Sequence, residues 1–114
     1  EICAGICLKP TPGHTPGHVS IEIESEGHRA IVTGDFIHHP CQMTRTDWCS
    51  SADYDQGQAR TTRETLLEDC ADTPVLIIGT HFATPTAGHV KRSEDAGYWL
   101  DTRTPFGKDN DRAK

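Results

Sequence analysis

The stretch KPTPGHTPGH, residues 9–18, decides how this chain folds. Proline fixes φ and lacks a backbone N–H, and glycine favours turns, so three prolines and two glycines within this stretch exclude a regular helix or strand. The stretch therefore predicts a stiff loop that presents His14 and His18. Apolar residues in 2–8 and 19–23 predict a strand on each side of the loop.

Residues 19–23, VSIEI, alternate apolar and polar side chains, which is the pattern of a half-buried strand. Residues 26–27, Glu-Gly, supply a turn, and residues 29–33 form a second strand, so the two strands are expected to make a hairpin. The second strand ends at Gly34-Asp35, which places a carboxylate directly after a strand.

Residues 38–52 are polar and irregular, and they predict a long loop. Either Asp53 or Asp55 is able to cap a helix that runs to about Cys70. Apolar residues at helical spacing give that helix one buried face.

The run VLII at 75–78 is the length of a strand that is covered on both faces, and it leads into Gly79-Thr80-His81. Residues 88–91 and 98–101 are two expected late strands, and residues 104–114 form a charged tail. Strands mixed with one clear helix indicate an α/β (α+β) layered fold.

The composition narrows the class of partner. The chain has 114 residues with 34% hydrophobic and 6% aromatic side chains, which is lean for a free-standing core. A net charge of -6 without a cluster of Lys and Arg argues against nucleic-acid binding. The longest apolar run, 75–78, is far shorter than the roughly 20 residues that cross a membrane, so no membrane partner is expected.

Five cysteines are an odd number, and no two of them form a C-x-x-C pair. A disulfide scaffold or a zinc ribbon is therefore not expected. The pattern favours free thiols and a cytoplasmic location.

Three side chains that are able to bind metals lie next to strand ends or in the stiff loop: His14, Asp35 and His81. Imidazole nitrogens and carboxylate oxygens suit Zn²⁺, Mn²⁺ or Fe²⁺, and a carboxylate is able to bridge two ions. Spacing alone leaves another interpretation open, namely a turn histidine, an Asp bonded to nearby backbone and a surface histidine.

Three segments in this order resemble the metallo-β-lactamase-fold hydrolases: 11–18 (TPGHTPGH), 33–35 (TGD) and 79–82 (GTHF). The stretch 34–38 (GDFIH) is most similar to the methyl-parathion-hydrolase-like and lactonase-like branch. Further residues that share this similarity are Gln42, Trp48, Asp53, Asp55, Thr62 and Arg63. The resemblance covers roughly residues 3–102.

The resemblance implies a four-layer αβ/βα sandwich, of which this chain would be the C-terminal half. Members of that family carry an H-x-H-x-D-H motif well before the TPGH loop, and no H-x-H occurs in this sequence. Residues 1–103 are therefore expected to be a partial domain and 104–114 a tail. A first residue of Glu1 instead of Met agrees with that expectation.

Carried over residue by residue, the resemblance makes His14 a ligand of the first metal and His81 a ligand of the second. Asp35 becomes the bridging carboxylate and the catalytic residue of this chain. His18 is expected to support the ligands, and His38 and Trp48 to line the pocket.

Phe36 and Trp48 are each either a pocket residue or a core residue, with the core favoured for Phe36. His28 and His89 are expected to be exposed to solvent, and His39 to point away from His38.

In the intact protein, the resemblance implies two divalent ions, with zinc the first choice and manganese or iron the alternatives. A hydroxide that bridges the ions would attack a small ester, lactone, phosphotriester or amide. The fragment alone is expected to be inactive, and to need its missing N-terminal half or to self-associate. The alternative is a non-catalytic metal-binding or structural module that self-associates.

Overall fold

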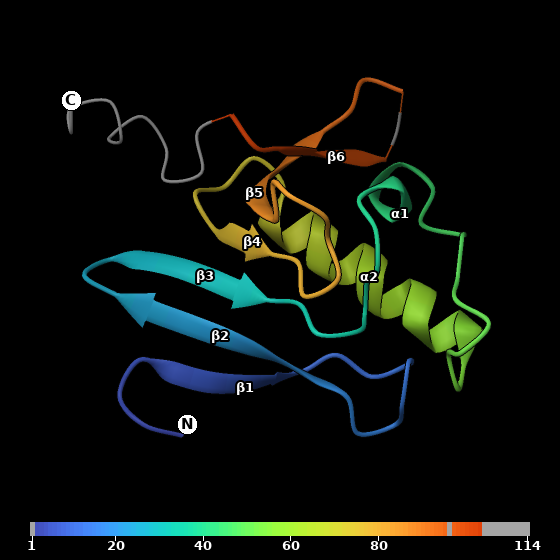
Figure 1. The fold of residues 1–114 in the computed structure, drawn as a ribbon, viewed down its shortest axis with the longest axis horizontal. Coiled ribbons are helices and arrows are strands. Elements are labelled where there is room, and N and C mark those ends of the chain that lie inside the picture. Colours follow the sequence, from blue (N-terminus) through green and yellow to red (C-terminus); the bar gives the residue numbers. More distant parts are fainter. Residues whose placement is uncertain (1, 96, 104–114) are drawn as a thin grey trace.

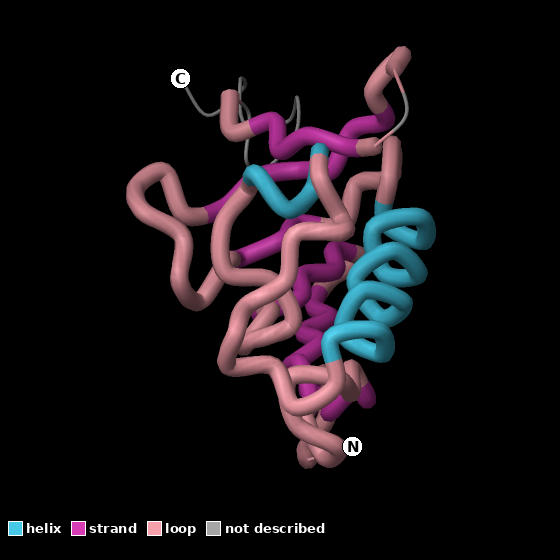
Figure 2. Tube along the Cα trace, turned by 90° about the vertical axis from the view of Figure 1, so that its right-hand side faces the viewer, coloured by secondary structure: helices cyan, strands magenta, loops and turns pink. Residues whose placement is uncertain are grey.

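The fold is a six-stranded sheet with one long helix on one face (Figures 1 and 2). The computed structural model describes residues 2–95 and 97–103. The elements in chain order are β1 (Ile6–Pro10), β2 (Val19–Ser25), β3 (His28–Val32), α1 (Cys41–Thr44), α2 (Gln56–Cys70), β4 (Leu76–Ile78), β5 (Ala87–Arg92) and β6 (Tyr98–Asp101). The strands lie in the sheet in the same order as in the chain.

The predicted hairpin is confirmed by antiparallel pairing of β2 and β3. Its turn uses Glu26 and Gly27, both with positive φ, at 51° and 82°. Two consecutive residues with positive φ give a tight turn whose twist matches the twist of the strands. The hairpin therefore follows from local sequence.

The pairing of β3 with β4 is parallel, and the other strand pairs are antiparallel. Parallel neighbours need a long crossover, and the segment that contains α2 supplies it. Val32 pairs with Ile78 at the carboxyl ends of the two strands. The residues that follow these two strands consequently leave the sheet at the same edge.

Helix α2 covers one face of this sheet and encloses the core. The side chains of Ile31, Ile77 and Val90 are at most 1% exposed and belong to one cluster with Leu66 and Leu67 of α2. Asp55 caps the helix, since its side chain accepts a hydrogen bond from the backbone N–H of Gln58 at 2.9 Å. The structure thus selects Asp55 from the two predicted caps.

The opposite face of the sheet carries an apolar row without a helix over it. Leu8 pairs with Ile21, and Ile21 with Val32, so their side chains share one face. Leu8 is 49% exposed and Ile21 is 38% exposed. In the strand predicted at 75–78, Ile77 is buried but Leu76 and Ile78 are only half-buried, so the expected cover on both faces is incomplete among the described residues.

Several expectations about local structure were wrong. The first strand is Ile6–Pro10 instead of 2–8, because Gly5 turns the chain at φ 84° and the strand then extends to Pro10. The short helix α1 interrupts the loop that was predicted for 38–52. His89 is 7% exposed instead of open to solvent, because it lies on β5 between β4 and β6.

The late strands are confirmed as β5 and β6, and all five cysteines are free. Among the described residues, no helix is long and apolar enough to cross a membrane. The charged tail 104–114 lies outside the described residues.

The open apolar face predicts that this chain self-associates when it is expressed alone. Light scattering after gel filtration should give a mass above the 12.5 kDa of one chain. The double variant Leu8→Lys/Ile21→Lys should move the mass toward that of the monomer, because it places charge on this face. Glu24→Lys, on the other face of β2, is the control and should leave the association unchanged. A monomeric unmodified chain would contradict the prediction.

Candidate metal centre

The stiff loop holds His14 against the start of α2. Gly13 has φ 137°, and a Cβ there would lie 2.3 Å from Cα of Ala59, so only glycine allows this approach. The backbone N–H of Tyr54 donates to the carbonyl of His14 at 2.9 Å, and that of Asp55 donates to the carbonyl of Gly13 at 2.9 Å. These contacts fix the backbone from which the His14 side chain projects.

Asp35 and His81 follow the parallel strands at the same distance in sequence. Asp35 is three residues after Val32, and His81 is three residues after Ile78. Two hydrogen bonds tie the two segments together: Gly34 N–H to Thr80 Oγ1 at 2.9 Å, and Thr80 N–H to Thr33 Oγ1 at 3.2 Å. The side chains of Asp35 and His81 are therefore brought face to face.

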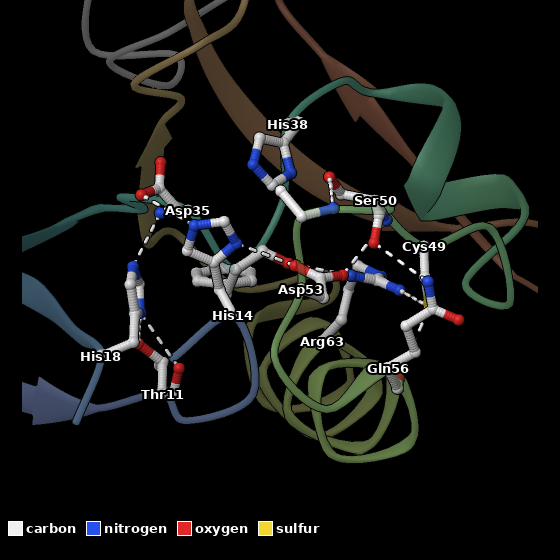
Figure 3. A network of polar contacts seen from close by, with 12 residues as sticks. Thr11, His14, His18, Asp35, His38, Cys49, Ser50, Asp53, Gln56 and Arg63 are labelled. Atoms are coloured by element: carbon white, nitrogen blue, oxygen red, sulfur yellow. Dashed lines mark hydrogen bonds and ion pairs between the residues drawn. The ribbon is translucent and has the colours of Figure 1, made fainter. Parts of the chain in front are cut away.

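The two carboxylate oxygens of Asp35 meet two different histidines. Oδ2 lies 3.5 Å from Nε2 of His14, and Oδ1 is hydrogen bonded to Nε2 of His81. His38 lies between these histidines, with ring centroids 5.4 Å from His14 and 5.1 Å from His81. Ligand atoms of His14, Asp35 and His38 all lie within 4.8 Å of one another (Figure 3). The structure thus gathers the three predicted ligands and His38 in one place.

A buried carboxylate orients His14. Nδ1 of His14 lies 2.9 Å from Oδ1 of Asp53, whose side chain is 2% exposed, and Oδ2 of Asp53 accepts from Ser50 N–H at 3.1 Å (Figure 3). A carboxylate at Nδ1 keeps the proton there and leaves the lone pair on Nε2, the nitrogen that faces Asp35. Sequence reasoning named Asp53 only as a helix cap and as part of the family resemblance. The 39 residues that separate it from His14 gave no signal for this contact.

His18 uses both ring nitrogens to hold protein groups. Its Nε2 accepts from the backbone N–H of Asp35 at 2.7 Å, and its Nδ1 lies 3.0 Å from the carbonyl of Thr11 and 2.9 Å from Thr11 Oγ1 (Figure 3). A Cβ at Gly34 would lie 2.8 Å from His18 Nε2, so the glycine makes room for this ring. His18 therefore fixes the backbone of Asp35 rather than facing the cluster.

The protonation states of the cluster follow from its contacts. The hydrogen bond from His81 lowers the pKa of Asp35, and the charge of His14 acts in the same direction. Burial lowers the pKa of His38, and the neighbouring His81 lowers it further. At neutral pH an ionised Asp35 and an uncharged His38 result, which are the forms that bind cations.

Three aromatic or histidine positions lie around the cluster in different ways. Trp48 is 50% exposed, with the Arg45 guanidinium 5.1 Å from its ring, whereas Phe36 is 1% exposed and belongs to the core. His39 is exposed, and its Nδ1 accepts from Cys41 N–H. Trp48 and His39 are thus the exposed side chains of these three.

Comparison with known families identifies this arrangement. A family model described as the metallo-beta-lactamase superfamily matches residues 2–81, which is more than half of the chain. This chain belongs to the metallo-beta-lactamase superfamily. The match includes the three segments on which the resemblance was based, up to His81. No curated protein sequence matches the chain.

Solved structures of this superfamily share the fold. AbOPH, described as a hydrolase, is 28% identical with a TM-score of 0.81, and the match covers 90% of this chain and 36% of AbOPH. AidC, described as a dizinc quorum-quenching lactonase, is 26% identical with a TM-score of 0.81, covering 89% and 34%. An N-acyl homoserine lactone hydrolase with product at its catalytic metal centre is 28% identical with a TM-score of 0.62, covering 75% and 34%.

These comparisons confirm the predicted family and fold. The chain spans about a third of the length of each of these three structures. The described sheet and helices are accordingly part of a metallo-beta-lactamase fold.

The burial of His38 predicts that the stability of the fold depends on pH. In the metal-free protein, its imidazole should titrate below the ordinary pKa of 6.5, because burial disfavours the imidazolium. Because the pKa of His38 is lower in the folded than in the unfolded protein, the uncharged ring contributes to stability at pH values above the unfolded pKa. This contribution is lost as the pH falls through the folded pKa. NMR titration of the His38 ring protons measures the pKa directly, with the urea-unfolded protein as reference. The variant His81→Asn should raise it, and a native pKa at or above the unfolded value would contradict the prediction.

Proposed function

We propose that this chain is the C-terminal part of a dinuclear metal-dependent hydrolase that acts on a small-molecule lactone, ester, phosphotriester or amide. One observation carries the proposal: the two oxygens of Asp35 face Nε2 atoms of two different histidines. A carboxylate in that position is suited to bridge two cations. Membership of the metallo-beta-lactamase superfamily supports the same conclusion.

The donor set fits divalent zinc. In this proposal His14 and Asp35 belong to the first ion, and Asp35 and His81 to the second. Nε2 of His14 is available because Asp53 occupies Nδ1. Among the described residues, Nδ1 of His38 is buried without a hydrogen-bond partner, which agrees with a group that has its partner in the loaded protein. Zinc accepts imidazole and carboxylate together, and manganese or iron are the alternatives.

Bound ions would supply an activated water and a Lewis acid. The residues of this chain would hold the metal ligands in fixed positions and protonation states. Asp35 stays ionised, His18 fixes its backbone N–H, and Asp53 keeps the His14 ring in one tautomer. His38 and the exposed Trp48 are proposed to line the substrate pocket. Side chains that are already fixed in this way do not have to reorient when charge develops on the substrate during the reaction.

Lactones are the first substrate class to test. AidC and the N-acyl homoserine lactone hydrolase are lactonases that align with 75% or more of this chain. Because the chain spans about a third of their length, the rest of the parent protein is proposed to supply the remaining ligands and the cover of the open sheet face.

A second candidate is a non-catalytic metal-binding or structural module that self-associates. The apolar row around Leu8 and Ile21 favours it, because a second copy of the chain would cover that row equally well. This candidate predicts zinc binding without turnover.

An activity assay separates the two candidates. It uses the zinc-loaded protein that is encoded by the longest reading frame containing this chain. This protein should hydrolyse an acyl homoserine lactone, an aryl ester or a phosphotriester, and Asp35→Asn should lower kcat/KM at least about 100-fold. Asp69→Asn is the control, because Asp69 is an exposed carboxylate on α2. Zinc binding without hydrolysis of any of these substrates would favour the non-catalytic module.

The carboxylate behind His14 gives a second test. Asp53→Asn should weaken zinc binding by about 10–100-fold, because His14 loses the group that sets its tautomer. Competition with a chromogenic chelator measures the affinity. Asp55→Asn is the matched control, since asparagine also caps helices and Asp55 does not touch His14 through its side chain. Equal affinities for both variants would count against a metal role for His14.

A further inference from the structure

A buried arginine, Arg63 of α2, reaches from the core to the 46–50 segment, which leads to the Asp53 that contacts His14. Arg63 is 1% exposed. Among the described residues, no carboxylate oxygen lies within 4.0 Å of its nitrogens. Its partners are neutral: Nη1 donates to the Phe36 carbonyl at 2.9 Å, and Nη2 donates to the carbonyls of Thr46 at 2.8 Å and Trp48 at 3.2 Å. Nη2 also lies 3.3 Å from Sγ of Cys49 (Figure 3).

A buried cation without a counter-charge depends on the carbonyls that solvate it. Removing a charge from water is costly, and charge-assisted hydrogen bonds to fixed dipoles are what offsets that cost here. Phe36 and Trp48 are far apart in sequence, so Arg63 fixes two separate segments relative to α2 at the same time. Nε of Arg63 is buried without a hydrogen-bond partner among the described residues, so the guanidinium depends on the bonds of Nη1 and Nη2. A shift of either segment would remove part of those bonds as well.

Gln42 of α1 completes this arrangement. Its Oε1 accepts from the backbone N–H of His38 at 2.6 Å and of His39 at 3.3 Å, and its Nε2 donates to the Trp48 carbonyl at 2.7 Å. The Trp48 carbonyl is thus shared by Gln42 and Arg63. We call the two side chains, Arg63 and Gln42, the polar clamp.

The polar clamp is attached to the metal centre on both sides. On one side, Arg63 binds the carbonyl of Phe36, the residue directly after Asp35, and Gln42 binds the backbone N–H of His38, whose ring lies in the cluster. On the other side, Trp48 leads into the turn in which Asp53 contacts His14. The ligands themselves have other supports, since His18 and Thr80 hold the Asp35 segment.

We infer that Arg63 is a positioning residue that sets the place of His38 and of the 46–50 segment over the metal centre. This inference rests on the proposed function. The ligands Asp35 and His81 keep their own supports, so loss of Arg63 loosens the pocket wall more than the ligand set. The consequence is weaker substrate binding, with the reacting groups left largely in place.

The shape of the guanidinium is essential to this role. Its two terminal nitrogens point to carbonyls of different segments, whereas a lysine has one nitrogen at the end of its chain. Arg63→Lys keeps the charge and lets the side chain reach one side only. Arg63→Met keeps the bulk and removes the donors.

The experiment uses the full-length protein that contains this chain, with Arg63→Lys, Arg63→Met and the matched controls Arg60→Lys and Arg60→Met. Arg60 lies one turn earlier on α2, is exposed and pairs with Glu64. Hydrogen exchange of residues 36–50 should accelerate about tenfold in Arg63→Lys and more in Arg63→Met, with β3, β4 and β5 unchanged. KM should rise about fivefold or more while kcat changes less, and zinc affinity should stay close to that of the wild type.

The possible outcomes are distinct. Faster exchange throughout the protein would mean that Arg63 is merely structural, and unchanged exchange in residues 36–50 would overturn the polar clamp. A fall in kcat with KM unchanged would overturn its assignment to the pocket wall. If the wild-type protein hydrolyses nothing, the proposed function fails, whereas the exchange and zinc measurements still decide whether Arg63 holds this segment.

Discussion

The parallel pairing of β3 with β4 is the constraint on which the site depends. Because Val32 lies opposite Ile78, the segments that follow leave the sheet side by side and in step. Equal offsets from paired residues bring Asp35 and His81 to the same height, where their side chains form a hydrogen bond. Hydrogen bonds from Gly34 N–H to Thr80 Oγ1 and from Thr80 N–H to Thr33 Oγ1 hold the two segments in register beyond the strands. A shift of the pairing by one residue would separate the carboxylate from the histidine.

Around that pair, the site is built from backbone contacts that only certain residues permit. Glycine at 13 and 34 lets the stiff loop and the His18 ring approach closely, and His18 spends both nitrogens on backbone groups. Arg63 supplies the same kind of support from the core. These polar contacts thus lie behind the proposed ligands, and they limit the motion of the ligand side chains.

Local patterns allowed much of the fold to be predicted. The hairpin, the cap of α2 and the two late strands follow from period-two alternation, turn residues and a capping Asp, all of which act within a few residues. The first strand was misplaced because the positive φ of Gly5 is not visible in composition, and α1 has only the four residues 41–44. His89 was misjudged because burial on a central strand depends on the neighbouring strands. Asp53 and Arg63 contact residues far away in sequence, so their roles required coordinates.

In the proposed dinuclear hydrolase, the open sheet face and the missing ligands have a common physical cause. A sheet that is apolar on both sides needs two covering layers, and the described residues supply α2 for one of them. The cluster lies at the edge of this sheet, where side chains from a second layer could also reach it. A segment that covers Leu8 and Ile21 would remove apolar surface from water and at the same time enclose Asp35 and His81. Stability and metal coordination are therefore expected to arise together when the covering layer binds, because one surface serves both.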